Sequence, residues 1–151
     1  PDDCWLTLRG LRTMGVRMAQ QSRAALHIAT WLHERPEVAQ VLHPALPDCP
    51  GHTYWKRDFT GAGSLFGVVL NSSYTRQNME HMINAMRLFG IGASWGGYES
   101  LVLPTTGGIT RNFGSDQPDA PAFRLQIGLE NTQDLIDDLE QAFNALHRSA
   151  A

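Results

Sequence analysis

Residues 64–70 (SLFGVVL) and 123–128 (FRLQIG) carry the two clearest strand patterns of the chain. The first is almost continuously apolar and rich in residues that favour strands, as in a central strand of a sheet. The second alternates apolar and polar residues, which predicts a strand with one buried face. Shorter extended segments are expected at 38–42, 91–94 and 100–103. Together these segments predict one small sheet.

Three helical patterns surround these strands. The first runs from the N-terminal end to Pro36, which ends it because proline has no amide hydrogen to donate. At 1.5 Å per residue, its roughly 25 to 30 residues would span about 40 Å, which is long for a small domain. The second helix begins at an N-cap, Thr75, and the third is expected to begin at Asn131, with Asp134 three residues on. The three apolar faces consist of Leu11, Met14, Met18, Ala25, Ala29 and Leu32; Met79, Met82, Ile83 and Met86; and Leu135, Ile136, Leu139, Phe143 and Leu146.

The order helix, strands, helix, strands, helix predicts an α+β fold, with a small antiparallel or mixed sheet and helices packed on one of its faces. The 151 residues suit one globular domain, and 42% of them are hydrophobic, which is enough for a core. A helix as long as the first one often bridges two domains, so we expect the chain to begin near a domain boundary. Residues 104–121 show no periodicity, which is typical of a functional or mobile loop.

The charge balance and the cysteine count exclude several classes of protein. Twelve basic and 15 acidic residues give a net charge of −3, whereas a nucleic-acid surface normally shows a basic excess, so we expect no nucleic-acid partner. No apolar run approaches the ~18 to 20 residues of a membrane span, so we expect no membrane partner. Cys4 and Cys49 are too few for a disulfide framework, which favours a cytoplasmic location.

Two familiar site patterns have little support. His43, Cys49 and His52 are close in sequence, but a zinc site needs four well-spaced ligands or three and a water, so we expect no metal site. Residues 92–96 (GASWG) match the Gly-x-Ser-x-Gly pattern of hydrolases, which requires a buried strand before the serine and a helix after it. Because the sequence indicates only a short extended segment before it and no helix after it, a nucleophilic serine is not expected.

Arg124 is the most informative single residue, because it lies in the middle of a strand between Phe123 and Leu125. A buried guanidinium without a partner costs several kcal/mol, so this one needs a carboxylate. An internal acid, Glu99 or Glu130, could neutralise it. Alternatively, the partner is a substrate carboxylate bound by two hydrogen bonds, which are worth about 1.5 to 3 kcal/mol and also determine its orientation.

The segment 94–100 (SWGGYES) is the second candidate binding region. Its glycines allow the backbone to approach a ligand closely, Ser94 offers a hydroxyl, and Trp95 offers an indole N–H on a flat apolar surface. A tight turn between two strands with aromatic packing would explain the same residues without any ligand.

Five segments in order resemble one protein family. They are 9–14 (RGLRTM), 54–61 (YWKRDFTG), 94–101 (SWGGYESL), 123–130 (FRLQIGLE) and 134–139 (DLIDDL). The chain resembles the C-terminal small domain of the Cys/Met-metabolism family of pyridoxal-phosphate (PLP) enzymes, and its closest branch is the cystathionine β-lyases. The resemblance covers nearly the whole chain. It implies that residues 1–36 link to a large domain that precedes them, and that residues 37–151 form the small domain.

The resemblance also implies roles for single residues. Arg124 matches the arginine that binds the substrate α-carboxylate, and Ser94 and Trp95 match residues that flank this carboxylate. Members that react at the γ-carbon usually have leucine in place of Trp95, so the expected reaction is β-elimination of cystathionine to homocysteine, pyruvate and ammonia. The alternative within the family is the small domain of a γ-lyase or γ-synthase.

The lysine that carries PLP belongs to the family's large domain, and none of the cofactor motifs occurs in this chain. Lys56 is the only lysine and lies in a different motif. The resemblance therefore implies PLP in the full-length enzyme, no cofactor bound to this chain, no catalytic residue within it, and no activity of the chain alone. Its expected partners are its own large domain, an amino-acid thioether substrate and further copies in a homo-oligomer, which is a tetramer in the family. The alternatives from other classes are a stand-alone module that binds small carboxylates and a self-associating fragment.

Overall fold

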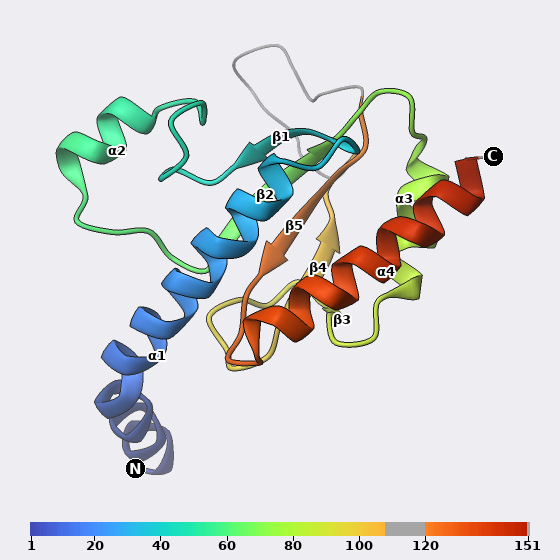
Figure 1. Ribbon diagram of the computed structural model, residues 1–151. Coiled ribbons are helices and arrows are strands. Elements are labelled where there is room, and N and C mark those ends of the chain that lie inside the picture. The colour runs from blue at the N-terminus through green and yellow to red at the C-terminus, as the bar shows by residue number, and fades with distance from the viewer. Residues whose placement is uncertain (108–119, 151) are drawn as a thin grey trace.

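The computed structural model of the protein describes residues 1–107 and 120–150. One mixed sheet of five strands has the order β1-β2-β5-β4-β3, and all neighbours are antiparallel except β3 and β4. Figure 1 shows α1 and α4 together on one face of this sheet, with α3 beside α4. The predicted α+β fold with a mixed sheet is confirmed. The elements are α1 (Asp2–His33), β1 (Val38–Leu42), α2 (His52–Asp58), β2 (Leu65–Leu70), α3 (Arg76–Ala85), β3 (Gly90–Ile91), β4 (Leu101–Pro104), β5 (Ala122–Gln126) and α4 (Thr132–Ala150).

The core lies between the sheet and its helices. Side chains alternate between the two faces of a strand, so every second residue of β2 and β5 enters this layer. The opposite face of the sheet is more open: Leu65, Gly67, Leu103 and Arg124 are only partly buried or exposed. Arg124 therefore belongs to the open face. The side chains that form the core from the sheet are Val41, Phe66, Val68, Leu70, Val102, Phe123 and Leu125, and those from the helices include Ile28, Leu32, Met79, Met82, Leu135, Leu139 and Phe143.

Two predicted helix starts are confirmed by their caps. Thr75 Oγ1 accepts a hydrogen bond from Asn78 N (3.2 Å), and Asn78 Oδ1 accepts one from Thr75 N (2.8 Å), so the two residues form a capping box at α3. Asn131 Oδ1 accepts from Gln133 N (2.8 Å) at the start of α4. The strands predicted at 38–42 and 64–70 are also present. The predicted loop at 104–121 lies mostly outside the described residues.

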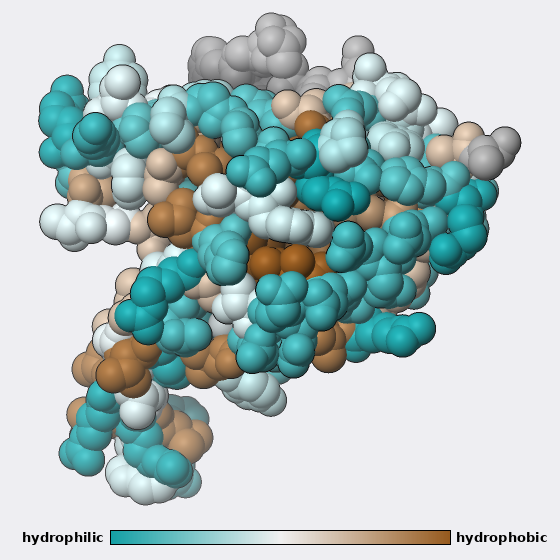
Figure 2. Space-filling view, in the orientation of Figure 1, coloured by the Kyte–Doolittle hydropathy of each residue, from teal (hydrophilic) through white to brown (hydrophobic). Residues whose placement is uncertain are grey.

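The first helix differs from the prediction in how much of its apolar face is buried. It is 32 residues long, and the C-terminal part of its apolar face is buried as expected. In its N-terminal half, however, Leu11, Met14 and Met18 are all more than 40% exposed. Figure 2 shows apolar patches on this protruding part of the molecule. The buried core of the described chain does not extend to these residues, and none of the three belongs to it.

The short helix α2 was not predicted from the sequence. Its seven residues are too few to show a helical period of apolar residues, and none of them is buried. It follows Gly51, whose φ of +84° favours glycine. In Figure 1, α2 extends beyond the β1 edge of the sheet.

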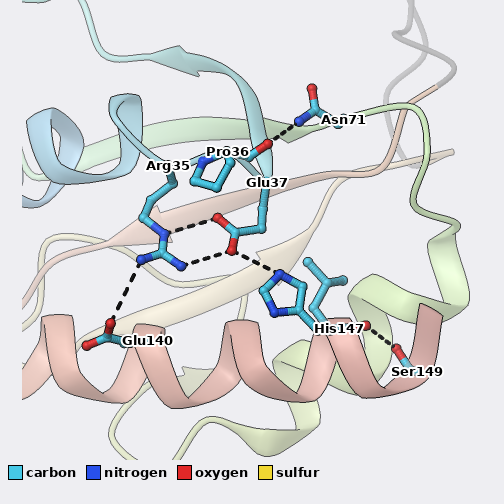
Figure 3. Close-up of polar contacts among 8 residues, drawn as sticks. Arg35, Pro36, Glu37, Asn71, Glu140, His147 and Ser149 are labelled. Atoms are coloured by element: carbon cyan, nitrogen blue, oxygen red, sulfur yellow. Dashed lines mark hydrogen bonds and ion pairs between the residues drawn. The ribbon is translucent and has the colours of Figure 1, made fainter. Parts of the chain in front are cut away.

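A buried carboxylate joins the end of α1 and the start of β1 to α4 (Figure 3). Glu37 is only 2% exposed, and Arg35 donates to it twice, from Nε (3.0 Å) and from Nη2 (2.9 Å). His147 Nε2 lies 3.0 Å from the same carboxylate, and Glu140 lies 3.9 Å from Arg35 on its far side. We call Arg35, Glu37 and His147 the Glu37 cluster.

None of the described helices is both long enough and apolar enough to cross a membrane.

Candidate functional site

Arg124 lies on β5 with β2 on one side and β4 on the other. Its register partners are Gly67 of β2 and Leu103 of β4. Gly67 has no side chain, and a Cβ there would meet Leu42 Cδ1 at 3.3 Å, which is a tight contact. Gly67 therefore places no side chain beside Arg124, and the space that a Cβ would occupy is bordered by Leu42 of β1.

The guanidinium of Arg124 is turned toward the loop between β3 and β4, residues 92–100. Its Nη2 donates to the carbonyl oxygens of Ala93 (2.8 Å) and Ser94 (3.2 Å). Its Nε is buried and has no hydrogen-bond partner among the described residues. A buried donor without an acceptor is unfavourable by about 1 to 3 kcal/mol. The arrangement is therefore suited to an incoming acceptor.

Neither internal acid considered from the sequence neutralises Arg124 within the described part of the chain. Glu130 instead accepts hydrogen bonds from the amide and the hydroxyl of Ser100, both at 2.8 Å. Glu99 is exposed and forms no ion pair with Arg124. In residues 1–107 and 120–150, the positive charge of Arg124 has no carboxylate partner.

The structure brings Ser94 and Arg124 together through the Ser94 carbonyl. The side chains of Ser94 and Trp95 are exposed, and Trp95 is 67% exposed. Trp95 borders a pocket of about 450 Å³ that lies between the start of β2 and α1, with Met14, Met18 and Gln126 in its walls. Trp95 thus directly follows Ser94, whose carbonyl accepts from Arg124, and it also faces this neighbouring, mainly apolar pocket.

The 92–100 loop is joined to the chain segment that follows β5. Leu129 N donates to Tyr98 O (2.7 Å), and Gly128 N donates to Ser100 Oγ (2.8 Å). A Cβ at Gly128 would collide with Tyr98 O and would lie 2.5 Å from the Glu99 backbone carbon. Only glycine fits at this position, and its close approach keeps the loop beside the end of β5.

Gln21 is a site residue that the sequence analysis missed. It is a polar residue on the buried side of α1, 3% exposed, and its Nε2 donates to Gly97 O (2.7 Å) and Ile127 O (3.1 Å). It therefore connects α1, the 92–100 loop and the end of β5. The signal was present, because Gln21 lies at helical spacing between Met18 and Ala25 on the apolar stripe.

The other sequence patterns do not form sites in the described residues. Ser94 of the Gly-x-Ser-x-Gly segment is in a loop that no helix follows. His43 Nδ1 accepts from Ala45 N (3.2 Å), and a His52 ring nitrogen lies 2.8 Å from Pro44 O. No group of three metal-binding side chains is present in this part of the chain. Lys56 is exposed on α2.

Comparison with known proteins adds independent information. The family model described as "Cys/Met metabolism PLP-dependent enzyme" matches residues 1–144. A putative cystathionine beta-lyase of Rhizobium johnstonii is 47% identical over 148 residues, which are 96% of this chain and 37% of the relative. The cystathionine beta-lyase MetC of Escherichia coli is 44% identical over 145 residues, 94% of this chain and 37% of the relative. The crystal structure of metB from Corynebacterium glutamicum superimposes with a TM-score of 0.83 at 33% identity, over 96% of this chain and 38% of that one. The chain thus spans less than two fifths of the length of these relatives.

Proposed function

Because the chain belongs to the Cys/Met metabolism family of PLP-dependent enzymes, we propose that it is the C-terminal small domain of a cystathionine β-lyase. The longer enzyme would cleave cystathionine by β-elimination to homocysteine, pyruvate and ammonia, in the cytoplasm. Residues 1–36 would link the two domains, and residues 37–151 would form the small domain. Trp95 supports β-elimination, since family members that react at the γ-carbon usually have leucine there.

The observation that carries this proposal is the state of Arg124. Its Nη2 is engaged by two backbone carbonyls, while its Nε is buried without an acceptor in the described chain. A guanidinium held in this way is ready for a carboxylate, because its orientation is already determined and its charge is not neutralised. We assign to Arg124 the α-carboxylate of the amino-acid substrate. Ser94 and Trp95 would flank that carboxylate.

The residues present in this chain do not fit the cofactor itself. PLP in this family is held by a lysine, and the only lysine here is the exposed Lys56 on α2, whereas Arg124 is on β5. Figure 1 shows α2 beyond the edge of the sheet and β5 within it. When bound, PLP supplies the electron-withdrawing ring that permits removal of the α-proton. In our proposal this group and its lysine belong to the large domain, and the present chain contributes the recognition of the carboxylate. The chain alone is then inactive.

The test uses the full-length protein that contains these residues, purified with PLP and supplied with cystathionine. We expect pyruvate and homocysteine, whereas γ-elimination would give 2-oxobutyrate and cysteine. Arg124→Gln should raise the KM for cystathionine about 10- to 100-fold, because a charged hydrogen bond of about 1.5 to 3 kcal/mol is lost. The PLP absorbance should not change.

The matched control is Arg148→Gln, which removes an exposed arginine from α4 and should leave KM unchanged. An unchanged KM in the Arg124 variant would refute the assignment of the carboxylate. Formation of 2-oxobutyrate would refute the β-lyase assignment, and pyruvate formation by the 151-residue chain alone would refute the assignment of PLP chemistry to the large domain.

A further inference from the structure

We propose that Gln21 is a positioning residue for Arg124, and that it acts through the 92–100 loop. The inference rests on the proposed function, since it concerns how the substrate carboxylate is oriented. Gln21 does not reach Arg124 itself. Its amide donates to two carbonyl oxygens, that of Gly97 in the loop and that of Ile127 just after β5.

The contact between Arg124 and the Ser94 carbonyl has two members, and each carbonyl that Gln21 binds belongs to a residue three positions after one of them. Gly97 follows Ser94, whose carbonyl accepts from Arg124, and Ile127 follows Arg124 itself. Any shift of the loop relative to β5 therefore changes the distance between the guanidinium and its two backbone acceptors. Gln21 binds both the loop and the end of β5 with one side chain, and it thereby fixes their relative position.

The remaining contacts do not replace this connection. Ser100, Glu130 and Leu129 join the far end of the loop to the segment after β5, but these contacts do not include α1. Gln21 is buried on α1, and α1 also lines the pocket beside Trp95. It thus sets the position of the loop against the helix as well as against the strand.

The chemistry of the position is specific to a primary amide. Both partners are carbonyl oxygens, so the side chain must supply two N–H donors at one nitrogen. Methionine has a similar length but no donor. A glutamate would place a carboxylate against two carbonyl oxygens in a buried site, which is unfavourable.

The decisive variant is Gln21→Met in the full-length, PLP-loaded protein, and Gln20→Met is its matched control. Gln20 is the neighbouring residue, is exposed, and accepts a hydrogen bond from the exposed side chain of Arg23 (2.9 Å). We expect Gln21→Met to raise the KM for cystathionine about tenfold, comparable to the loss of one hydrogen bond at the site, with kcat within about twofold. Gln20→Met should change neither constant. A shorter amide in Gln21→Asn cannot span both carbonyls and should raise KM in the same way.

Two further measurements separate positioning from a purely structural role. Inhibition by alanine, which has a carboxylate, should weaken by the same factor as KM, whereas inhibition by ethylamine, which lacks one, should not change. In the Arg124→Gln background, Gln21→Met should raise KM no further, because its effect passes through Arg124. Multiplicative effects of the two substitutions, or equal weakening of both inhibitors, would overturn the inference.

These results also distinguish the two proposals. If Arg124→Gln raises KM and Gln21→Met does not, only the positioning role of Gln21 is refuted. If Arg124→Gln leaves KM unchanged, the assignment of the carboxylate itself is refuted.

Discussion

His43 illustrates how much a single buried side chain depends on its protonation state. Its ring is fully buried and packs edge-on against Phe66, with 5.5 Å between the ring centroids. Because Nδ1 accepts from the amide of Ala45, a neutral ring carries its proton on Nε2. That nitrogen is buried without a partner among the described residues. Burial lowers the pKa of His43 below its ordinary value of 6.5.

This pKa shift predicts a pH dependence of stability at the scale of one residue. As the pH falls through the unfolded-state pKa of about 6.5, the unfolded chain binds more protons at His43 than the folded chain does, so the free energy of unfolding falls with the pH. His43→Leu should flatten the urea-unfolding free energy around this pH. His27→Leu, at an exposed position of α1, should keep the slope. An unaltered slope in the His43 variant would contradict the prediction.

At the scale of the elements, the Glu37 cluster connects α1 and β1 to α4. Burial by itself raises the pKa of Glu37, but the hydrogen bonds from Arg35 and the backbone and the charges of Arg35 and His147 outweigh it, and the net pKa lies below 4.5. The guanidinium of Arg35 also lies over the rings of Trp31 and Phe143, at 5.2 and 5.3 Å from their centroids. Three elements therefore meet at one carboxylate.

Glu37→Gln should lower the free energy of unfolding by about 1 to 3 kcal/mol at neutral pH, since it removes the buried carboxylate that accepts two charged hydrogen bonds from Arg35. A lowered pKa means that the contribution of Glu37 is present above pH 4.5 and is lost as the pH falls through the folded-state pKa. The variant should lack this acid-induced loss in denaturation curves measured from pH about 6 to about 3.

Glu140→Gln is the matched control, because Glu140 also lies near Arg35 but is mainly exposed. An exposed pair of this kind is worth less than about 1 kcal/mol, so its removal should change little. Equal destabilisation by the two substitutions would show that burial of Glu37 is not what makes the cluster stabilising.

At the scale of the whole molecule, the N-terminal part of α1 exposes many apolar side chains that no other described element buries. Apolar side chains there are 44% to 71% exposed, and large exposed apolar patches mark surfaces that bind other protein. The chain spans about 37% of the length of its relatives. In our proposal, the large domain covers this surface. The exposed apolar residues of this segment are Trp5, Leu6, Leu8, Leu11, Met14, Val16 and Met18.

The isolated 151-residue chain should therefore self-associate, and the double variant Leu11→Glu/Met14→Glu should shift it toward monomer. Its free energy of unfolding should change by less than about 0.5 kcal/mol, because neither side chain contacts the core. Sedimentation equilibrium over a wide range of concentrations measures the association. Gln20→Glu/Thr30→Glu adds the same charge at other exposed positions of α1 and should leave it unchanged. A chain that is monomeric at all concentrations would contradict the prediction.

Several elements could be predicted because their signals are local. The apolar run at 64–70 and the alternation at 123–128 indicated β2 and β5, and Thr75 indicated the start of α3. The short helix α2 could not be predicted, since its seven residues are too few to show a helical period of apolar residues. For the site, Arg124 was found because a charged residue inside a strand pattern is conspicuous. Gln21 was missed, because one glutamine on a long amphipathic helix is compatible with many environments.

The sequence by itself determined the fold class, the family, and the candidates Arg124, Ser94 and Trp95, because periodicity and motifs are carried by residues close together along the chain. Only the tertiary structure decided that β5 lies between β2 and β4, and that Arg124 donates to the loop carbonyls rather than to Glu99 or Glu130. The same holds for Gln21, which bonds to Ile127, 106 positions away. Such contacts depend on how strands and helices pack after the chain has folded back on itself, and no local pattern encodes that arrangement.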